Sequence, residues 1–279
     1  NFTGVRASFD LGIKFDLFAL TLNDRQTNIT NATSNVYPYP SRPDTSSSLY
    51  GLFLSHKLND ANRIDLLTYY DINRKNIIAG ENSFERTTVA LTHFGDYENL
   101  STIVEGAYQF GIESGKDVSA YTVSASGRYK VGSSFFGAGV DLGGRRIIKK
   151  TEMNTFQVVY GSRNRFYGFM DYFIIMPANT DNAGVNNYYL TYELAPKNSK
   201  FSYTAAVNHF TTNQTRNDLS TLGQELDLTI RYNLVKGTTI RWGGSVFVPG
   251  DLMKTFFKVG NVERNDPSFW TYIMFTTNI

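Results

Sequence analysis

The sequence predicts an all-β fold, an antiparallel transmembrane β-barrel. Three observations predict it: apolar and polar residues alternate with a period of two, the alternating segments run to about ten residues or more, and their connections alternate between short and long. A strand points successive side chains to opposite faces, so each such segment has one apolar and one polar face. A barrel places the first face against lipid and the second around a lumen.

The alternation is clearest in residues 223–234. A helix would scatter its polar and apolar residues around the axis, whereas a strand separates them. The next segment, residues 239–248, repeats the pattern after the tight-turn sequence Val235-Lys236-Gly237. One face of the first segment would carry Glu225, Asp227, Thr229, Arg231 and Asn233, and the other Leu226, Leu228, Ile230, Tyr232 and Leu234.

Composition agrees with a barrel and excludes other classes. Aromatic residues make up 15% of the chain, yet its mean hydropathy is −0.29. No run of about 20 apolar residues is present, as each span of a helical membrane protein would need. The absence of cysteine excludes disulfides and thiolate metal sites, and a net charge of +2 gives no basic field for nucleic acid.

The connections fall into two classes, which a transmembrane barrel explains by placing short turns in the periplasm and long loops outside. The short turns are expected near residues 10–12, 59–62, 95–98, 131–133, 196–199 and 235–237. The longer stretches are expected at residues 24–47, 76–83, 113–116, 144–184, 211–222 and 249–267.

This division gives about thirteen strands in residues 1–279, which we treat as one domain. Single-chain bacterial barrels usually have an even number of strands. Either a further strand lies within residues 167–175, or strands precede Asn1. The first short turn favours the second explanation, because it makes the opening strand descend from the outside.

Several short stretches, in order, resemble the alginate-export porin family. The resemblance implies an outer-membrane barrel of about eighteen strands, of which about five would be missing here. It also implies passage of an anionic polysaccharide through an arginine-lined constriction. The stretches are Phe2–Arg6, Glu85–Thr88, the residues Tyr97, Glu105 and Gln109, Thr155-Phe156 with Tyr167–Asp171, Leu222–Leu228 with Tyr232, Trp242–Gly250, and Trp270–Met274.

Inward arginines would replace the hydration of polymer carboxylates with charge-assisted hydrogen bonds, and nearby carboxylates would keep the arginines oriented. The alternative is that these residues are lumen charges paired for structure. By strand parity, the candidate pathway cations are Arg6, Arg86, Arg128, Arg231 and Arg241, with Arg145 near a rim. The candidate anions are Glu105, Glu225 and Asp227, with Asp171 in the longest loop.

No pattern indicates catalysis, a metal or a cofactor. His56, His93 and His209 are too far apart for metal-ligand spacing, and no catalytic triad or phosphate-binding loop is present. The carboxylates of Glu225 and Asp227 could suggest a glycosidase, but beside Arg231 they are more simply lumen charges.

The leading hypothesis is therefore a channel of the bacterial outer membrane, not an enzyme, for an anionic polysaccharide or another polar solute. The alternative is a structural or partner-binding barrel within a larger assembly, and an embedded barrel enzyme is disfavoured. The expected partners are outer-membrane lipid, a polar or anionic saccharide, and other periplasmic or outer-membrane proteins, with no nucleic acid.

Overall fold

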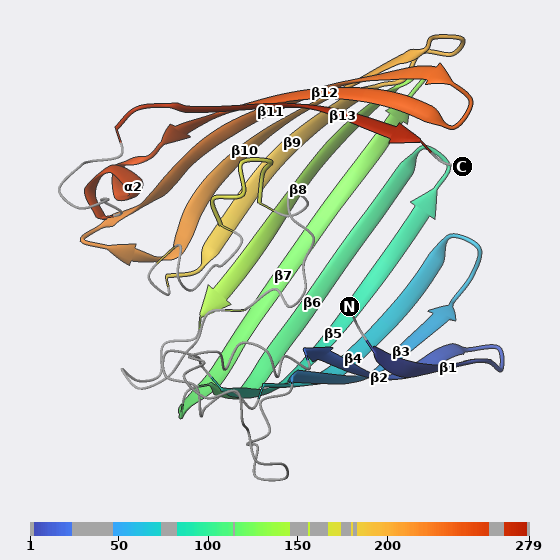
Figure 1. Ribbon diagram of the computed structural model, residues 1–279, viewed down its shortest axis with the longest axis vertical. Helices are drawn as coiled ribbons and strands as arrows, with labels where there is room; N and C mark the ends of the chain where they lie inside the picture. Colours follow the sequence, from blue (N-terminus) through green and yellow to red (C-terminus); the bar gives the residue numbers. More distant parts are fainter. Residues whose placement is uncertain are drawn as a thin grey trace, which may run out of the picture. The chain divides into compact units, whose positions relative to one another are not determined.

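The computed structural model describes residues 3–23, 47–73, 83–113, 115–145, 156, 167–173, 180, 183–256 and 265–277. These residues form a 13-stranded sheet in which hydrogen-bonded neighbours follow the sequence order, and the antiparallel fold class and the number of strands are confirmed (Figure 1). The strands are β1 (Thr3–Asp10), β2 (Lys14–Asn23), β3 (Ser47–Lys57), β4 (Asn62–Asn73), β5 (Phe84–Tyr97), β6 (Leu100–Glu113), β7 (Lys116–Val131), β8 (Ser134–Arg145), β9 (Val185–Leu194), β10 (Phe201–Arg216), β11 (Leu219–Val235), β12 (Thr238–Pro249) and β13 (Ser268–Thr277).

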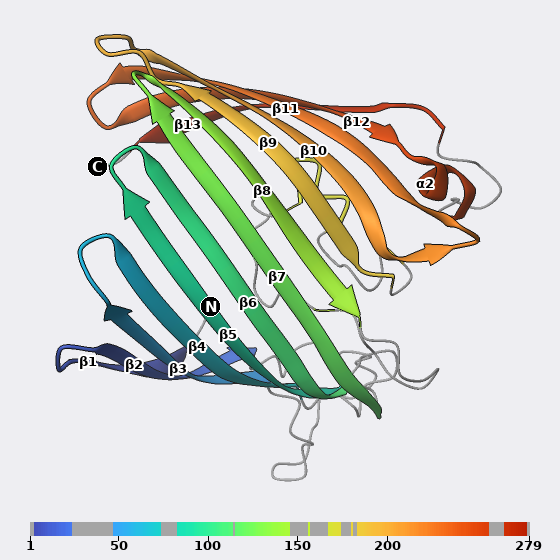
Figure 2. The same cartoon turned by 180° about the vertical axis from the view of Figure 1, so that it is seen from behind.

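The chain divides into two compact units. The first contains β1 to β4, β5 up to His93, β6 from Gly106 and β7 up to Tyr121. The second contains the remaining parts of those three strands together with β8 to β13. Figure 2 shows β8 to β12 of the second unit from behind, as consecutive neighbours.

One face of the sheet is apolar and exposed, as the period of two predicts. On β11, Glu225 and Asp227 are buried, whereas Leu226 and Leu228 between them are 41% and 47% exposed. The same division holds in the first unit, where buried Thr88 and Ala90 alternate with exposed Val89 and Leu91 on β5. A row of exposed aliphatic and aromatic side chains is the surface that a barrel presents to lipid. We call it the apolar face and the opposite one the polar face.

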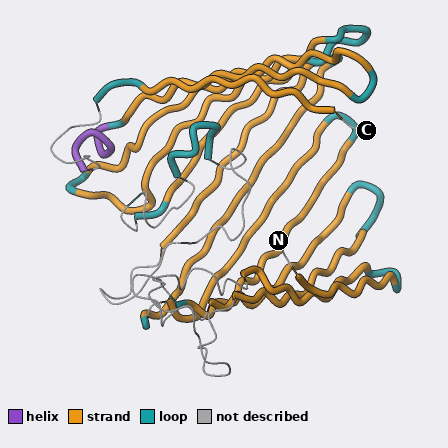
Figure 3. The backbone as a smooth tube through the Cα atoms, in the orientation of Figure 1, coloured by secondary structure: helices purple, strands orange, loops and turns teal. Residues whose placement is uncertain are grey.

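The short turns expected from the sequence are confirmed between β1 and β2, β3 and β4, β5 and β6, β7 and β8, β9 and β10, and β11 and β12 (Figure 3). Two connections that were expected to be long are instead tight. Strand β6 ends at Glu113 and β7 begins at Lys116. Strands β10 and β11 run through most of residues 211–222 and are joined at Asn217 and Asp218.

The turn between β10 and β11 explains the second correction. Asn217 and Asp218 have φ angles of 47° and 63°, in the left-handed region. Asparagine and aspartate tolerate this conformation better than other non-glycine residues, and successive positive φ angles match the twist of a two-residue hairpin. The polar composition of this stretch therefore marks the end of a long hairpin rather than a loop.

The further strand considered within residues 167–175 is absent from its described part, because residues 167–173 form turns. Residues 174–175 lie outside the described residues, as do most residues of the connections from β2 to β3, from β4 to β5 and from β8 to β9. No helix in the described ranges is long and apolar enough to cross a membrane.

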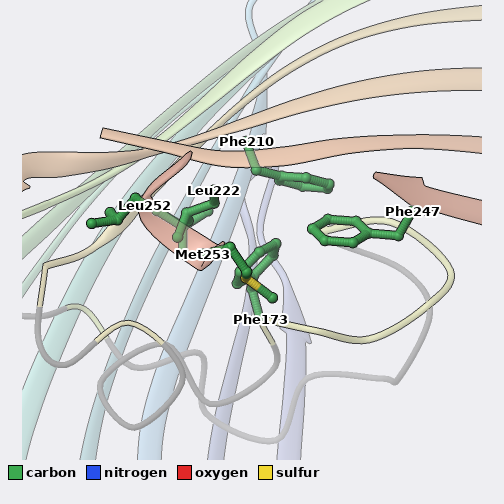
Figure 4. Close-up of a cluster of buried hydrophobic side chains, with 7 residues drawn as sticks. Phe173, Phe210, Leu222, Phe247, Leu252 and Met253 are labelled. Atoms are coloured by element: carbon green, nitrogen blue, oxygen red, sulfur yellow. The ribbon is translucent and has the colours of Figure 1, made fainter. Parts of the chain in front are cut away.

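Residues 167–173, which we call the inward segment, pack on the polar face of the second unit. Phe173 meets Phe210 of β10, with 4.9 Å between ring centroids, and Tyr172 meets Phe247 of β12, with 4.5 Å. The short helix α2 (Asp251–Phe256) adds Leu252 and Met253 to the same cluster (Figure 4). This small apolar core holds a loop segment against an otherwise polar surface.

Candidate functional site

Glu225 anchors the inward segment to β11. The backbone N–H of Met170 donates a hydrogen bond of 2.9 Å to Glu225 Oε1, and Glu225 is only 1% exposed. Gly168 has a φ of 80°, and a Cβ built at this position would lie 2.5 Å from Glu225 Oε1. Glycine is therefore required at residue 168 both for its backbone conformation and for the close approach of the carboxylate.

Asp227, two residues further along β11, binds neutral donors. Ser245 Oγ donates a hydrogen bond of 2.6 Å to one carboxylate oxygen, and Asn208 Nδ2 donates one of 3.1 Å to the other. Asn187 Nδ2 donates in turn to Asn208 Oδ1 at 3.2 Å. These bonds form a buried polar chain across β9, β10, β11 and β12.

The hydrogen bonds of Glu225 and Asp227 described above go to a backbone amide, a serine and an asparagine, and none goes to an arginine. The reason is the position along the strand. Asp227 and Arg231 share the polar face but are four residues apart, about 13 Å in an extended strand.

A cavity of about 380 Å³ lies on the polar face of the second unit, bordered by Gly168 and Phe169 of the inward segment. Ser124 and Asp141 both line this cavity, and Ser124 Oγ donates a hydrogen bond of 2.6 Å to Asp141 Oδ1. Among the described residues, no arginine or lysine lines this cavity. We call it the acidic pocket, after the carboxylates of Glu105, Asp141 and Asp227 in its wall.

Tyr167 begins the inward segment beside these groups. Its burial, with a smaller contribution from the negative charge of Asp141, raises the pKa of its phenol far above the usual range.

Arg231 and Arg241 form a pair of like charges on the polar face. They are direct register partners on β11 and β12, so their side chains leave the sheet side by side. The described residues provide no carboxylate within salt-bridge distance of either. We call these two residues the arginine pair, and they lie toward the short-turn ends of their strands.

Arg128 lies on the polar face of β7 and has partners. Its guanidinium is 2.6 Å from Glu193 of β9 and lies over the ring of Phe135, 3.7 Å from the centroid. Both side chains of this ion pair remain well exposed, at 49% and 38%. The carboxylate of Glu193 and the ring of Phe135 thus orient the guanidinium of Arg128.

The remaining candidates occupy other environments. Arg86, 3% exposed, contacts Asp71 at 2.8 Å and Glu113 at 3.4 Å in the first unit, which fits a charge paired for structure. Arg6, also in the first unit, pairs with Asp16 at 2.5 Å. Asp171 is in the inward segment with a φ of 58°. The backbone of Arg145 ends β8, and its side chain lies outside the described residues.

The histidines lie apart from any metal-ligand arrangement. His93 Nε2 is 3.0 Å from Asn62 Oδ1, and the ring of His209 is 6.4 Å from that of Tyr188. Within the described part of the chain, no group of three or more His, Cys, Asp or Glu residues could hold a metal ion.

Sequence reasoning missed part of the acidic pocket. Asp141, Tyr189 and Asn208 were not selected, and Asn187 was noted only for its place on a polar strand face. Alternation assigns such residues to a face of the sheet, but it does not show which residues of neighbouring strands lie opposite each other. That information comes from the register, which pairs Asp141 with Asn187 and Asn208 with both Tyr189 and Glu225.

The solved structures that resemble this chain have low sequence identity to it. OpdO of Pseudomonas aeruginosa is 13% identical with a TM-score of 0.57, and the match covers 98% of this chain and 69% of that one. OccAB4 of Acinetobacter baumannii is 11% identical with a TM-score of 0.56, covering 98% and 65%. The outer membrane protein OprD of P. aeruginosa is 11% identical with a TM-score of 0.51, covering 97% and 67%. At such identities the similarity shows the fold alone.

Among curated proteins, none has a sequence that matches this chain. The family comparison is more informative, since the model described as alginate export matches residues 40–260. The family model and the shared fold place this protein in the bacterial outer membrane. Because the match covers most of the 279 residues, the chain belongs to the alginate-export family.

Proposed function

We propose that this protein passes an anionic polysaccharide, or another polar solute, through a lumen lined by the polar face and its arginines. The observation that carries the proposal is the arginine pair. Like charges directly opposite each other destabilise a sheet, and guanidinium groups remain charged at all relevant pH values. Arg231 and Arg241 lack an ion-pair partner among the described residues, so a passing anion would relieve their repulsion.

The chemistry of the guanidinium group suits a carboxylated polymer. Each guanidinium offers several N–H donors in a planar fork, which fits a carboxylate with two parallel hydrogen bonds. Arg128 extends the cationic surface of the second unit, but its ion pair with Glu193 moderates its charge. Conduction needs binding that is strong enough for entry and weak enough for release, and a partly neutralised arginine set has this property.

We further infer that the thirteen strands are part of a closed barrel of about eighteen. Strands β1 and β13 are the two ends of the described strand order. An open strand edge in the hydrocarbon core would leave backbone N–H and C=O groups unpaired, at a cost of several kcal/mol for each group. Additional strands between these two edges would complete the hydrogen bonding.

A second candidate function is a structural or partner-binding barrel. The observation that favours it is the inward segment, which Glu225 and the aromatic cluster hold on the polar face. A segment fixed in this way could close a lumen instead of narrowing it. Electrical measurements separate the two candidates.

The decisive experiment is single-channel recording in planar lipid bilayers under a KCl gradient. The wild-type protein is expected to conduct with an anion preference, seen in the sign of the reversal potential. The double variant Arg231→Glu and Arg241→Glu is expected to lose or reverse this preference, while Arg231→Lys with Arg241→Lys keeps it because the charge remains. Absence of conductance would reject the channel and favour the second candidate. Conductance with an unchanged reversal potential in the glutamate variant would reject the role of the arginine pair.

A further inference from the structure

We infer that the acidic pocket is a subsite for a sugar ring that presents hydroxyl or amino donors and carries no carboxylate. The inference rests on the proposed function, since it assigns a class of sugar to one position along the proposed solute pathway. The pocket belongs entirely to the second unit and has a volume of about 380 Å³. This size is within the range of small-molecule sites in proteins.

The wall of the pocket is rich in hydrogen-bond acceptors. Glu105, Asp141 and Asp227 contribute carboxylates, each with about four lone-pair positions when ionised. Ser124 donates to Asp141, and Ser245 and Asn208 donate to Asp227, and these neutral donors use only part of the acceptor capacity of the two carboxylates. A ligand that fits here must therefore donate hydrogen bonds.

An independent observation points to a missing donor. Asn187, 3% exposed, lines the pocket and uses its Nδ2 to donate to Asn208. Its Oδ1 is also buried, and within the described part of the chain it has no hydrogen-bond partner. Buried polar atoms in folded proteins almost always have a partner. A hydroxyl or amino group of a ligand in the pocket would supply it.

The aromatic residues of the pocket fit a sugar ring as well. Phe169 borders the cavity from the inward segment and Tyr189 from β9. A sugar has apolar C–H faces and a polar rim, so one aromatic wall and several acceptors match its two kinds of surface. Small-molecule sites commonly combine aromatic lining with a few oriented polar groups.

The charge of the pocket excludes a uronate at this level. A carboxylate on the sugar would face the carboxylates of Asp141 and Asp227 with no lining arginine or lysine among the described residues. Like charges in a partly enclosed site repel strongly because the effective dielectric constant is lower than in water. A protonated amine, in contrast, would form charge-assisted hydrogen bonds there. The pocket and the arginine pair thus differ in the sugar chemistry that they accept.

The test is current block of single wild-type channels by three probes of equal length: a glucosamine hexamer, maltohexaose and an oligouronate hexamer. The variant is Asp141→Asn, which keeps the size of the side chain and an acceptor for Ser124. The matched control is Asp218→Asn in the exposed turn between β10 and β11. Asp141→Asn is expected to raise the half-blocking concentration of the glucosamine hexamer about tenfold. It is expected to raise the half-blocking concentration of maltohexaose by a smaller factor and to leave block by the oligouronate no weaker than in the wild type. Asp218→Asn is expected to change none of the three.

Calorimetric titration of the detergent-solubilised protein with the same probes measures their binding to the pocket independently of conduction. If the glucosamine hexamer binds more weakly to Asp141→Asn than to the wild type, the subsite is supported even when the channel carries no current. In that case only the proposed function fails. Equal binding by wild type and Asp141→Asn, or oligouronate binding that depends on Asp141, would overturn the subsite. A second variant, Asp227→Asn, is expected to weaken binding of the glucosamine hexamer in the same way, and its failure to do so counts against the inference.

Discussion

Glu225 and Asp227 are two residues apart on the same face of β11, yet their carboxylates bind different parts of the molecule. Glu225 binds the backbone of a segment that is 55 residues away in the sequence, whereas Asp227 binds side chains of the neighbouring strands. Strand parity predicts their shared face correctly. Their partners depend on a loop that folds back onto the sheet, and local alternation contains no information about that.

The contact between Gly168 and Glu225 gives a prediction for the inward segment. In Gly168→Ala the new Cβ would meet the Glu225 carboxylate at 2.5 Å, on a backbone with a φ of 80°. We expect the inward segment to be displaced and the single-channel current to change in size and become noisier. The measurement is single-channel recording of the variant beside the wild type.

Gly115→Ala is the matched control for this prediction. Gly115 has a similar φ of 75°, but a Cβ there meets nothing within 4 Å. The control therefore carries the backbone cost of about 1–2 kcal/mol without the clash. Equal effects of the two substitutions on the current would show that the contact with Glu225 does not position the inward segment.

At the scale of elements, the sequence predicts single hairpins better than it predicts loops. The turn at residues 235–237 joins β11 and β12, but the register also shifts between Asn233 and Val235, and this shift places Ser245 opposite Asp227 and Arg241 opposite Arg231. Locating the short turn predicts the hairpin, whereas the exact pairs also depend on this irregularity. The stretch of residues 211–222 was wrongly predicted as a loop, because a polar composition outweighed an alternation that continues to both sides of Asn217.

The turn between β10 and β11 provides a prediction at this scale. Asn217 and Asp218 both have positive φ angles. Replacing Asp218 by valine is expected to lower the free energy of unfolding by about 1–2 kcal/mol, because a β-branched side chain is strained in the left-handed region. Replacing Asn217 by glycine is expected to preserve or raise stability. Urea unfolding of the protein in lipid vesicles measures both, and a valine variant as stable as the wild type would contradict the assigned turn.

At the scale of the whole molecule, the fold class and strand number followed from the sequence because the lipid imposes a strict division between two faces. The acidic pocket did not follow, because it combines residues of β6, β7, β8, β9, β10 and β11 with the inward segment. Along the polar face of β11 the charges are ordered by sign, because Glu225 and Asp227 precede Arg231 toward the short turn.

The assignment of the two faces makes a prediction about membrane insertion. Leu228 is near the middle of β11 on the apolar face and is 47% exposed. Thr229, the next residue, is at the same depth on the polar face. Leu228→Arg is expected to lower the free energy of unfolding in lipid vesicles by about 2–4 kcal/mol, which is the cost of a cation that faces lipid at the bilayer midplane. Thr229→Arg is expected to lower this free energy clearly less, because its side chain faces the lumen. It is also expected to increase the anion selectivity of the channel. The fluorescence of the chain's two tryptophans during urea unfolding reports the first effect, and reversal potentials report the second. Equal destabilisation by the two arginines would mean that the apolar face does not face lipid, and the barrel assignment would fail with it.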